Sequence, residues 1–263
     1  MWSGIWGSVA LVRRSALALT QFTVRTLSLG DEQSAAPAVL ELTAWLGNGH
    51  ADHAVLLELG ALTLESTITE HGGDGRVVAQ QALSLRDAAR EEGATSGSME
   101  TRTHLRLSVA VPSPKLWSPR SPNLYHAHWT IRSDGNADGA RVGRSHAHAR
   151  FGIRQLNISG QYFLLNGKRH FLVGTGDDFG YPTEAPPQNL SVYRARLGAM
   201  KAYGFDFVRL HSHFESKMYF DVAAELGFFI SPALPGTAWS ADCKEIALRT
   251  WTWWINELRN CPS

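Results

Sequence analysis

The strongest constraint on the fold is the stretch from Gly204 to Pro235, whose pattern is strand, helix, strand. A short apolar run, Phe205–Leu210, precedes an amphipathic segment, Ser216–Leu226, which Gly227 ends. A second apolar run, Phe228–Ser231, follows. The whole stretch of about thirty residues has the length of one parallel crossover unit. We therefore predict a parallel sheet with right-handed crossovers in this part of the chain.

The first strand of this stretch carries polar groups where a buried parallel strand is normally apolar. Alternation sends Arg209, His211 and His213 to one face of the strand and Val208 and Leu210 to the other. A guanidinium and two imidazoles on a covered face are costly. We therefore expect that face to open onto a polar site.

Further strands and helices are expected on both sides of this stretch. A hairpin turns at Asn166-Gly167, and a buried strand at Phe171–Gly174 leads into Asp177 and Asp178. A helix ends before Gly204, the natural residue after a helix C-terminus, and another helix covers Asp242–Leu258. The apolar stripe of the helix before Gly204 consists of Val192, Leu197, Met200 and Tyr203.

The first half of the chain has a different period, because short alternating runs are separated by turn-rich spacers. Such a pattern from about Gln21 to Phe151 is typical of an antiparallel immunoglobulin-like sandwich. Pro112–Tyr125 is expected to be a rigid extended crossover and not a strand, because its prolines lack donors. The expected strands are Phe22–Leu29, Val39–Leu46, Val55–Leu59 with Leu62–Thr69, Val77–Leu83, Leu105–Val111, Tyr125–Ile131 and Ser145–Phe151.

The N-terminus is expected to contribute one more strand, Ile5–Val12. The alternative is a targeting segment, but Arg13 and Arg14 follow the apolar run, whereas a secretory signal has its charge first. The run is also too short to span a membrane.

Histidines recur on two of the sandwich strands. Alternation points His126 and His128 outward on one strand, and His146 and His148 outward on the other. If the two strands pair, four imidazoles could cluster and bind a metal. The favoured interpretation is a solvated or domain-facing polar surface without a metal.

Composition excludes several partners. The net charge is +1 and there is no basic block, so we expect neither a nucleic acid nor a membrane partner. If Cys243 and Cys261 lie on one terminal helix, they are about 27 Å apart, which is too far for a disulfide. Compartment and oligomeric state are not predicted.

Four motifs follow one another along the chain: Gly4–Val9; Leu116–Pro119 with Pro122–Tyr125; Phe151–Arg154 with Phe163–Lys168; and Tyr203–Arg209 with Tyr219–Gly227. In this order they resemble segments of the family 2 glycoside hydrolases, which include β-galactosidases, β-glucuronidases and β-mannosidases. The four segments are the last jelly-roll strand, the proline-tryptophan crossover, the junction into the barrel, and barrel strand two with its helix.

The resemblance implies a mixed fold, an immunoglobulin-like antiparallel β-sandwich followed by a partial (β/α)8 TIM barrel of about three βα units. Residues 1–20 would be a remnant of the last jelly-roll strand, and residues 21–155 the sandwich. Residues 156–263 would be the N-terminal part of the barrel, which is the catalytic domain in this family.

The resemblance also implies a retaining β-glycosidase that uses two glutamates about 5 Å apart. Asn260–Ser263 resembles the segment just before barrel strand four, so both catalytic glutamates are expected to be missing and the chain alone inactive. Asn256-Glu257 has the dipeptide of the acid/base residue, but it lies before that segment instead of after it.

The substrate-binding wall of the pocket is what the resemblance assigns to this chain. Arg209, one of His211 and His213, and the pair Asp177 and Asp178 would face a β-glycoside in the full-length parent. No cofactor is implied, and Ala233 stands where the family often has an acidic residue, which argues against a divalent metal.

Two other functions remain open. The chain could be a non-catalytic carbohydrate-binding or scaffold protein derived from such an enzyme. A small open-sheet hydrolase is a third reading, but Ser212 lacks the flanking glycines of a nucleophile elbow. As part of a barrel, residues 156–263 would expose apolar edges, so we expect poor solubility of that half alone.

Overall fold

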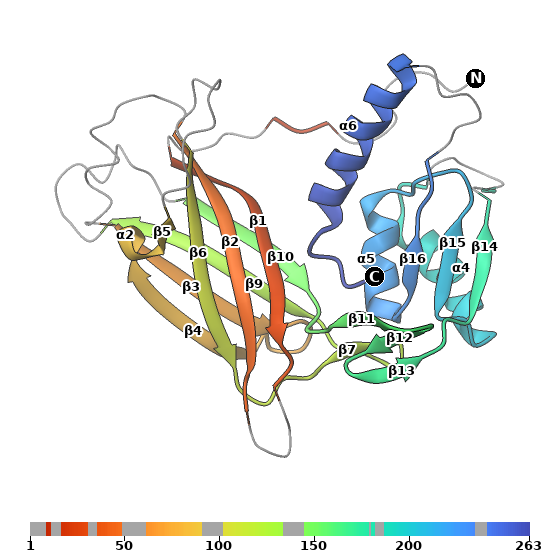
Figure 1. Ribbon diagram of the computed structural model, residues 1–263, viewed down its shortest axis with the longest axis horizontal. Coiled ribbons are helices and arrows are strands. Elements are labelled where there is room, and N and C mark those ends of the chain that lie inside the picture. Colours follow the sequence, from red (N-terminus) through yellow and green to blue (C-terminus); the bar gives the residue numbers. More distant parts are fainter. Residues whose placement is uncertain are drawn as a thin grey trace.

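The computed structural model describes residues 9–11, 17–30, 36–48, 62–90, 102–133, 145–178, 180–181, 187–234 and 241–263. An all-β part comes first along the chain and an α/β part second, and the two lie side by side (Figure 1). None of the helices in the described ranges is long and apolar enough to cross a membrane.

The all-β part contains two four-stranded sheets, both antiparallel throughout. The first sheet has the order β1-β2-β6-β5, and the second has the order β10-β9-β3-β4. A short helix, α2 (Leu85–Ala88), connects β4 to β5 and is capped by Ser84, whose side chain accepts from the amide of Asp87. The strands are β1 (Leu17–Ser28), β2 (Ala38–Asn48), β3 (Leu62–Glu70), β4 (Val77–Ser84), β5 (Ala89–Arg90), β6 (Arg102–Val111), β9 (Tyr125–Ser133) and β10 (Ser145–Phe151).

One apolar core lies between these sheets. Alternate residues are buried along strands such as β3, where Leu64 and Ile68 are fully enclosed. The ring of Phe22 from the first sheet meets that of Trp129 from the second at 5.0 Å. The sandwich predicted from the alternating runs is therefore confirmed, with Tyr125, Ala127, Trp129 and Ile131 on its core face.

Three predictions for the first half need comment. Of the expected strand Ile5–Val12, the described residues Val9–Leu11 are exposed and outside any strand. Val55–Leu59 lies outside the described residues. Within the crossover Pro112–Tyr125, β7 (Trp117–Ser118) and β8 (Ser121–Pro122) pair antiparallel, so the expectation of no strand there is wrong. A two-residue ladder accommodates proline because few of its amides need a partner.

A three-stranded antiparallel sheet begins the second part. Its strands are β11 (Leu156–Ser159), β12 (Tyr162–Leu165) and β13 (Lys168–His170). Asn166 and Gly167 both have positive φ, 51° and 77°, as a type I′ hairpin turn requires. The predicted hairpin is confirmed.

A parallel sheet of order β14-β15-β16 follows, as predicted. Its strands are β14 (Gly174–Asp177), β15 (Phe207–Leu210) and β16 (Phe229–Ser231), and its helices are α4 (Leu190–Ala202), α5 (Lys217–Leu226) and α6 (Ala241–Leu258). Gly204 and Gly227 follow α4 and α5 in the left-handed conformation, at φ 87° and 74°, which glycine adopts at low cost.

Three details of this part differ from expectation. The predicted strand Phe171–Gly174 is wrong, because pairing with β15 starts only at Gly174 and Phe171 is 84% exposed. Tyr203 does not belong to the buried stripe of α4, since the chain leaves the helix there and exposes 84% of the residue. Cys261 lies beyond α6, so the two cysteines do not share one helix, and neither of these described residues forms a disulfide.

Trp117 joins the two parts. It is fully buried, and its indole Nε1 donates to the carbonyl of Ala224 in α5 at 2.9 Å. Its ring meets Phe229 of β16 edge-on at 5.2 Å. Gly152 lies against it, where a Cβ would be 2.7 Å from that of Trp117 and 3.0 Å from that of Pro262, so only glycine fits without displacement.

The segment after α6 returns to both parts of the molecule. The side chain of Asn260 accepts from the amide of Val24 at 2.8 Å and donates to the carbonyl of Phe22 at 2.7 Å. The carbonyl of Ser263 accepts from the amide of Ile230 in β16 at 2.9 Å. The last residue therefore lies next to β16.

Candidate functional site

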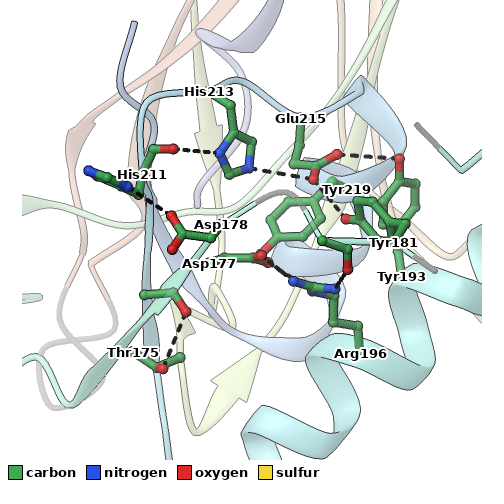
Figure 2. Close-up of polar contacts among 12 residues, drawn as sticks. Thr175, Asp177, Asp178, Tyr181, Tyr193, Arg196, His211, His213, Glu215 and Tyr219 are labelled. Carbon is green, nitrogen blue, oxygen red and sulfur yellow. Dashed lines mark hydrogen bonds and ion pairs between the residues drawn. The ribbon is translucent and has the colours of Figure 1, made fainter. Parts of the chain in front are cut away.

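The predicted site residues gather at the carboxyl edge of the parallel sheet (Figure 2). Asp177, the last residue of β14, is in register with Leu210, the last residue of β15. The loops that leave these strands carry Asp178, His211 and further polar groups. Ligand sites in parallel sheets form at this edge, because the strand ends and their loops converge there.

Three of these side chains are exposed. The Nδ1 atom of His211 lies 2.8 Å from a carboxylate oxygen of Asp178, and the two side chains are 56% and 80% exposed. Arg209 is exposed between Gly176 and Ser231, its register neighbours on the adjacent strands. The small neighbours leave space over the guanidinium. This edge thus offers solvent a carboxylate, an imidazole and a cation.

His213 lies behind this exposed group. Its Nδ1 is 2.9 Å from the carbonyl of His211, and because a carbonyl only accepts, Nδ1 carries the proton. Its Nε2 is then 3.6 Å from a carboxylate oxygen of Glu215. Ser212, between the histidines, has φ 58°, which is uncommon for a residue with a Cβ and turns the two rings to different sides. His211, and not His213, is the exposed histidine.

Glu215 is buried, with 1% of its surface exposed. The hydroxyl of Tyr181 donates to its Oε1 at 2.7 Å, and the hydroxyl of Tyr193 lies 3.4 Å from its Oε2. Burial raises the pKa of Glu215, while the hydrogen bond from Tyr181 and the charge of His213 act in the opposite direction. Glu215 therefore organises the loop between β15 and α5 from within.

Asp177 is also buried, with 2% exposed. Arg196 of α4 donates from Nε to its Oδ2 at 2.9 Å and from a terminal nitrogen to the carbonyl of Gly180 at 2.8 Å. Burial alone would lower the pKa of Arg196, but the hydrogen bond and charge of Asp177 raise it. Asp177 therefore ties β14 to α4, a position that argues against direct contact with substrate.

Sequence reasoning missed the inner group of Glu215, Arg196, Tyr181, Tyr193 and Tyr219. Arg196 had a detectable signal, because it interrupts the helical spacing from Val192 to Met200 with a charge. The others had none, since nothing in the local pattern distinguishes a buried Glu215 from a solvated one. The ion-pair partner of Asp177 is Arg196.

The two other candidate groups lie elsewhere. Asn256 and Glu257 are on α6, and they line a cavity of about 480 Å³ together with His126 and His148 of the sandwich, so they are remote from Asp178. His128 and His148 do face each other on paired strands, with ring centroids 6.3 Å apart. Among the described residues no group of three or more His, Cys, Asp or Glu could hold a metal ion.

The exposed groups suit recognition of a hydroxyl-rich ligand. A carboxylate accepts, a guanidinium donates, and an imidazole can do either, so together they match alternating hydroxyls. Of the carboxylates at this edge, Asp177, Asp178 and Glu215, only Asp178 is exposed. In the described part of this edge, one carboxylate therefore faces solvent and two are held inside the protein.

Comparison with known proteins gives a consistent result. The family model "Glycosyl hydrolases family 2" matches residues 53–154. The chain is 25% identical over 232 residues to a β-galactosidase of Erwinia tasmaniensis and 26% identical over 235 residues to one of Vibrio cholerae. Each alignment covers 88% of this chain and 20% of the relative. The chain therefore spans about a fifth of the length of these curated relatives.

Solved structures share the fold. A glycosyl hydrolase family 2 member from Bacteroides cellulosilyticus matches with a TM-score of 0.73 and 19% identity, over 94% of this chain and 30% of that chain. Bacteroides uniformis β-glucuronidase matches with a TM-score of 0.66 and 18% identity, over 92% and 26%. The resemblance inferred from the four motifs is thus confirmed.

Proposed function

We propose that this chain, a relative of the family 2 glycosyl hydrolases, forms one wall of a β-glycoside pocket in a retaining glycosidase. The single observation that carries the proposal is the exposed pair Asp178 and His211 beside Arg209, at the carboxyl edge of β14 and β15. In this proposal the sugar hydroxyls contact these three side chains, while His213, Glu215 and Asp177 hold the loops in position.

We further propose that β14, β15 and β16 with α4, α5 and α6 are the first βα units of a TIM barrel. The contact between the carbonyl of Ser263 and the amide of Ile230 supports this, because it occupies the place where a fourth parallel strand would pair with β16. Residues 1–20 would then end a jelly roll, 21–155 would form the sandwich and 156–263 the barrel portion. The sandwich strand β1 begins slightly earlier, at Leu17.

Both reacting glutamates would lie outside this sequence, so the chain alone is proposed to bind but not to hydrolyse. The second candidate function is a non-catalytic carbohydrate-binding or scaffold protein. The observation that favours it is that Asp178 is the only exposed carboxylate among Asp177, Asp178 and Glu215. Reading the messenger RNA past the codon for Ser263 separates the two functions, because only the enzyme requires two further glutamates.

The experiment combines turnover with binding. The purified chain is incubated with aryl β-galactoside and aryl β-glucuronide, and release of the aryl group is expected to equal that of buffer. Binding of methyl β-galactoside and methyl β-glucuronide is followed by saturation-transfer NMR. His211→Ala is expected to remove the signal, and His146→Ala, an exposed histidine on β10, is expected to keep it.

Two results would contradict the proposal. Turnover above buffer would refute the absence of catalytic groups. A saturation-transfer signal that is the same in His211→Ala and the unmodified chain would refute the assigned wall.

A further inference from the structure

A second cavity, of about 400 Å³, lies where the sandwich meets the α/β part. Its lining comes from β1, from the junction after β10 and from the segment after α6. Its charged lining residues are Arg25, Arg154 and Arg259, and none of its lining residues is acidic. It shares no residue with the site around Asp178 and His211.

Arg154 is the buried cation of this cavity, and the described residues offer it no carboxylate. Arg25 pairs with Glu41 at 3.0 Å, and Arg259 donates to the hydroxyl of Thr23 at 3.1 Å. Arg154 instead lies between two aromatic rings, 5.7 Å from the centroid of Trp117 and 5.5 Å from that of Phe229. Its Nε is buried without a hydrogen-bond partner among the described residues.

The surroundings do not neutralise this charge. Burial lowers the pKa of Arg154, yet a guanidinium stays protonated in proteins. Burial raises the pKa of the Cys261 thiol, which therefore stays uncharged at neutral pH. A buried charge without a partner is costly, and ring contacts offset only part of that cost. The local chemistry thus calls for an anion at Arg154.

Neutral polar groups of the cavity are held in place. Asn260 is fixed by its two hydrogen bonds to β1, and the side chain of Gln155 donates to the carbonyl of Leu27 at 2.8 Å. Asn157 on β11 is exposed and completes the rim. A guanidinium presents parallel N–H donors that match two oxygens of one oxyanion.

We propose that this cavity binds one small oxyanion on Arg154, with Arg259 and Asn157 at its rim. The group recognised is a phosphate, sulfate or carboxylate, either free or carried on a small molecule. The site is separate from the carbohydrate wall and does not depend on the proposed glycosidase function.

The test measures anion binding to the whole 263-residue chain at constant ionic strength, with chloride as the reference. Inorganic phosphate, sulfate and acetate are titrated separately while ¹H–¹⁵N spectra are recorded. We expect saturable shifts at the amides of Gln155, Asn157 and Asn260. Stronger binding of phosphate or sulfate than of acetate would identify a tetrahedral anion, and the reverse a carboxylate.

Variants provide the control. Arg154→Met keeps the apolar stem between Trp117 and Phe229 and removes the charge, so phosphate affinity is expected to fall roughly tenfold or more. Arg76→Met, at an exposed position before β4, is expected to leave affinity unchanged. If Arg154→Met does not fold, the proposal is tested by the spectra of the unmodified chain, in which saturable shifts should be confined to the amides around the cavity. Shifts scattered over the surface, or none that saturate, would mean an adventitious ion only and would overturn the proposal.

Discussion

Burial divides the ionisable side chains at the carboxyl edge of β14 and β15 into two groups. Asp178, His211 and Arg209 face solvent, whereas Asp177 and Glu215 are enclosed by tyrosines and Arg196. The same residue types therefore have different roles a few ångströms apart. In the proposed pocket, the carboxylates of the inner group would keep the loops in one conformation, so that the outer group would meet a ligand without reorganising.

Glu215 is expected to make the stability of the chain depend on pH. Its folded pKa is raised by burial above its ordinary value of 4.5, so the folded state keeps a proton that the unfolded state loses. Stability therefore falls as pH rises from about 4.5 through the folded pKa. Glu215→Gln should remove this part of the decrease, as measured by urea unfolding between pH 4 and pH 7.

Glu257→Gln is the matched control, because Glu257 is exposed on α6. It should reproduce the pH dependence of the unmodified chain. If stability changed with pH equally in Glu215→Gln and in the unmodified chain, Glu215 would not retain its proton as its burial implies.

At the residue scale, alternation along β15 was sufficient to predict that Arg209 lies on a polar face. It could not predict that His213 lies inside and His211 outside, because the left-handed Ser212 breaks the alternation between them. Nor could it predict that Asp177 is buried, since the partner, Arg196, comes from a helix that is distant in the sequence. Long-range pairing of this kind leaves little local signal.

Among the elements, β9 and β10 carry a row of imidazoles that is closer than the sequence implied. His126 lies 2.8 Å from Nδ1 of His71 and has its ring 6.0 Å from that of His128. A hydrogen bond between two imidazoles needs one donor and one acceptor, so both rings cannot be protonated and keep it. Few of the imidazoles in this row can therefore be protonated at the same time.

His126→Gln is expected to reduce the loss of stability in acid. Burial and the charges of His71, His128, Arg150 and His148 lower the folded pKa of His126 below 6.5. The unfolded state therefore binds protons first, and stability falls as pH drops from about 6.5 through the folded pKa. Urea unfolding at pH 7.5 and pH 5.5 should show a smaller difference for the variant.

The exposed His146, outside the described ring contacts, gives the control variant His146→Gln. Its pH dependence should match that of the unmodified chain. If His126→Gln lost as much stability in acid as His146→Gln, the imidazole row would not be the cause of the acid sensitivity.

Element boundaries were predictable where a single residue sets them. Gly204, Gly227 and the turn Asn166-Gly167 end or reverse the chain as expected, because their positive φ favours glycine or asparagine. The start of β14 was not predictable from the sequence. Phe171–Val173 is as apolar as a strand, and only pairing with β15 decides where the strand begins. The short ladder of β7 and β8 likewise depends on packing of Trp117 against distant residues.

In the whole molecule, Trp117 and Lys201 connect the parts. Lys201 donates to the carbonyls of Pro119 and Gly227, both at 2.9 Å, and so links the crossover to α4 and the end of α5. Together with the indole of Trp117 on Ala224, these contacts should couple unfolding of the sandwich to that of the helices.

Trp117→Phe is expected to weaken this coupling. The variant loses the hydrogen bond to Ala224 and part of the buried ring, which costs about 1–2 kcal/mol. Helix ellipticity at 222 nm should then be lost at lower urea than the folded ¹H–¹⁵N resonances of the sandwich strands. Trp253→Phe, at a position that is 56% exposed, should not separate the two signals. Coincident transitions in Trp117→Phe would refute the coupling.

The exposed apolar side chains of α6 are expected to limit solubility. Ile246, Leu248, Trp253 and Ile255 are all exposed on this helix. Ile246→Glu with Ile255→Glu should reduce light scattering at high protein concentration without lowering the urea midpoint, because neither side chain is buried. Scattering equal to that of the control pair Glu245→Gln and Glu257→Gln would contradict this expectation.

The hydrogen bonds of Asn260 to Phe22 and Val24 also bear on how the molecule forms on the ribosome. They join residues 236 and 238 positions apart, and they cover backbone groups at the free edge of β1. At about 5–20 residues per second, Asn260 is added roughly 10–50 s after its partners. For that time the edge of β1 is open to other nascent chains, so newly made sandwiches compete between self-completion and pairing with one another.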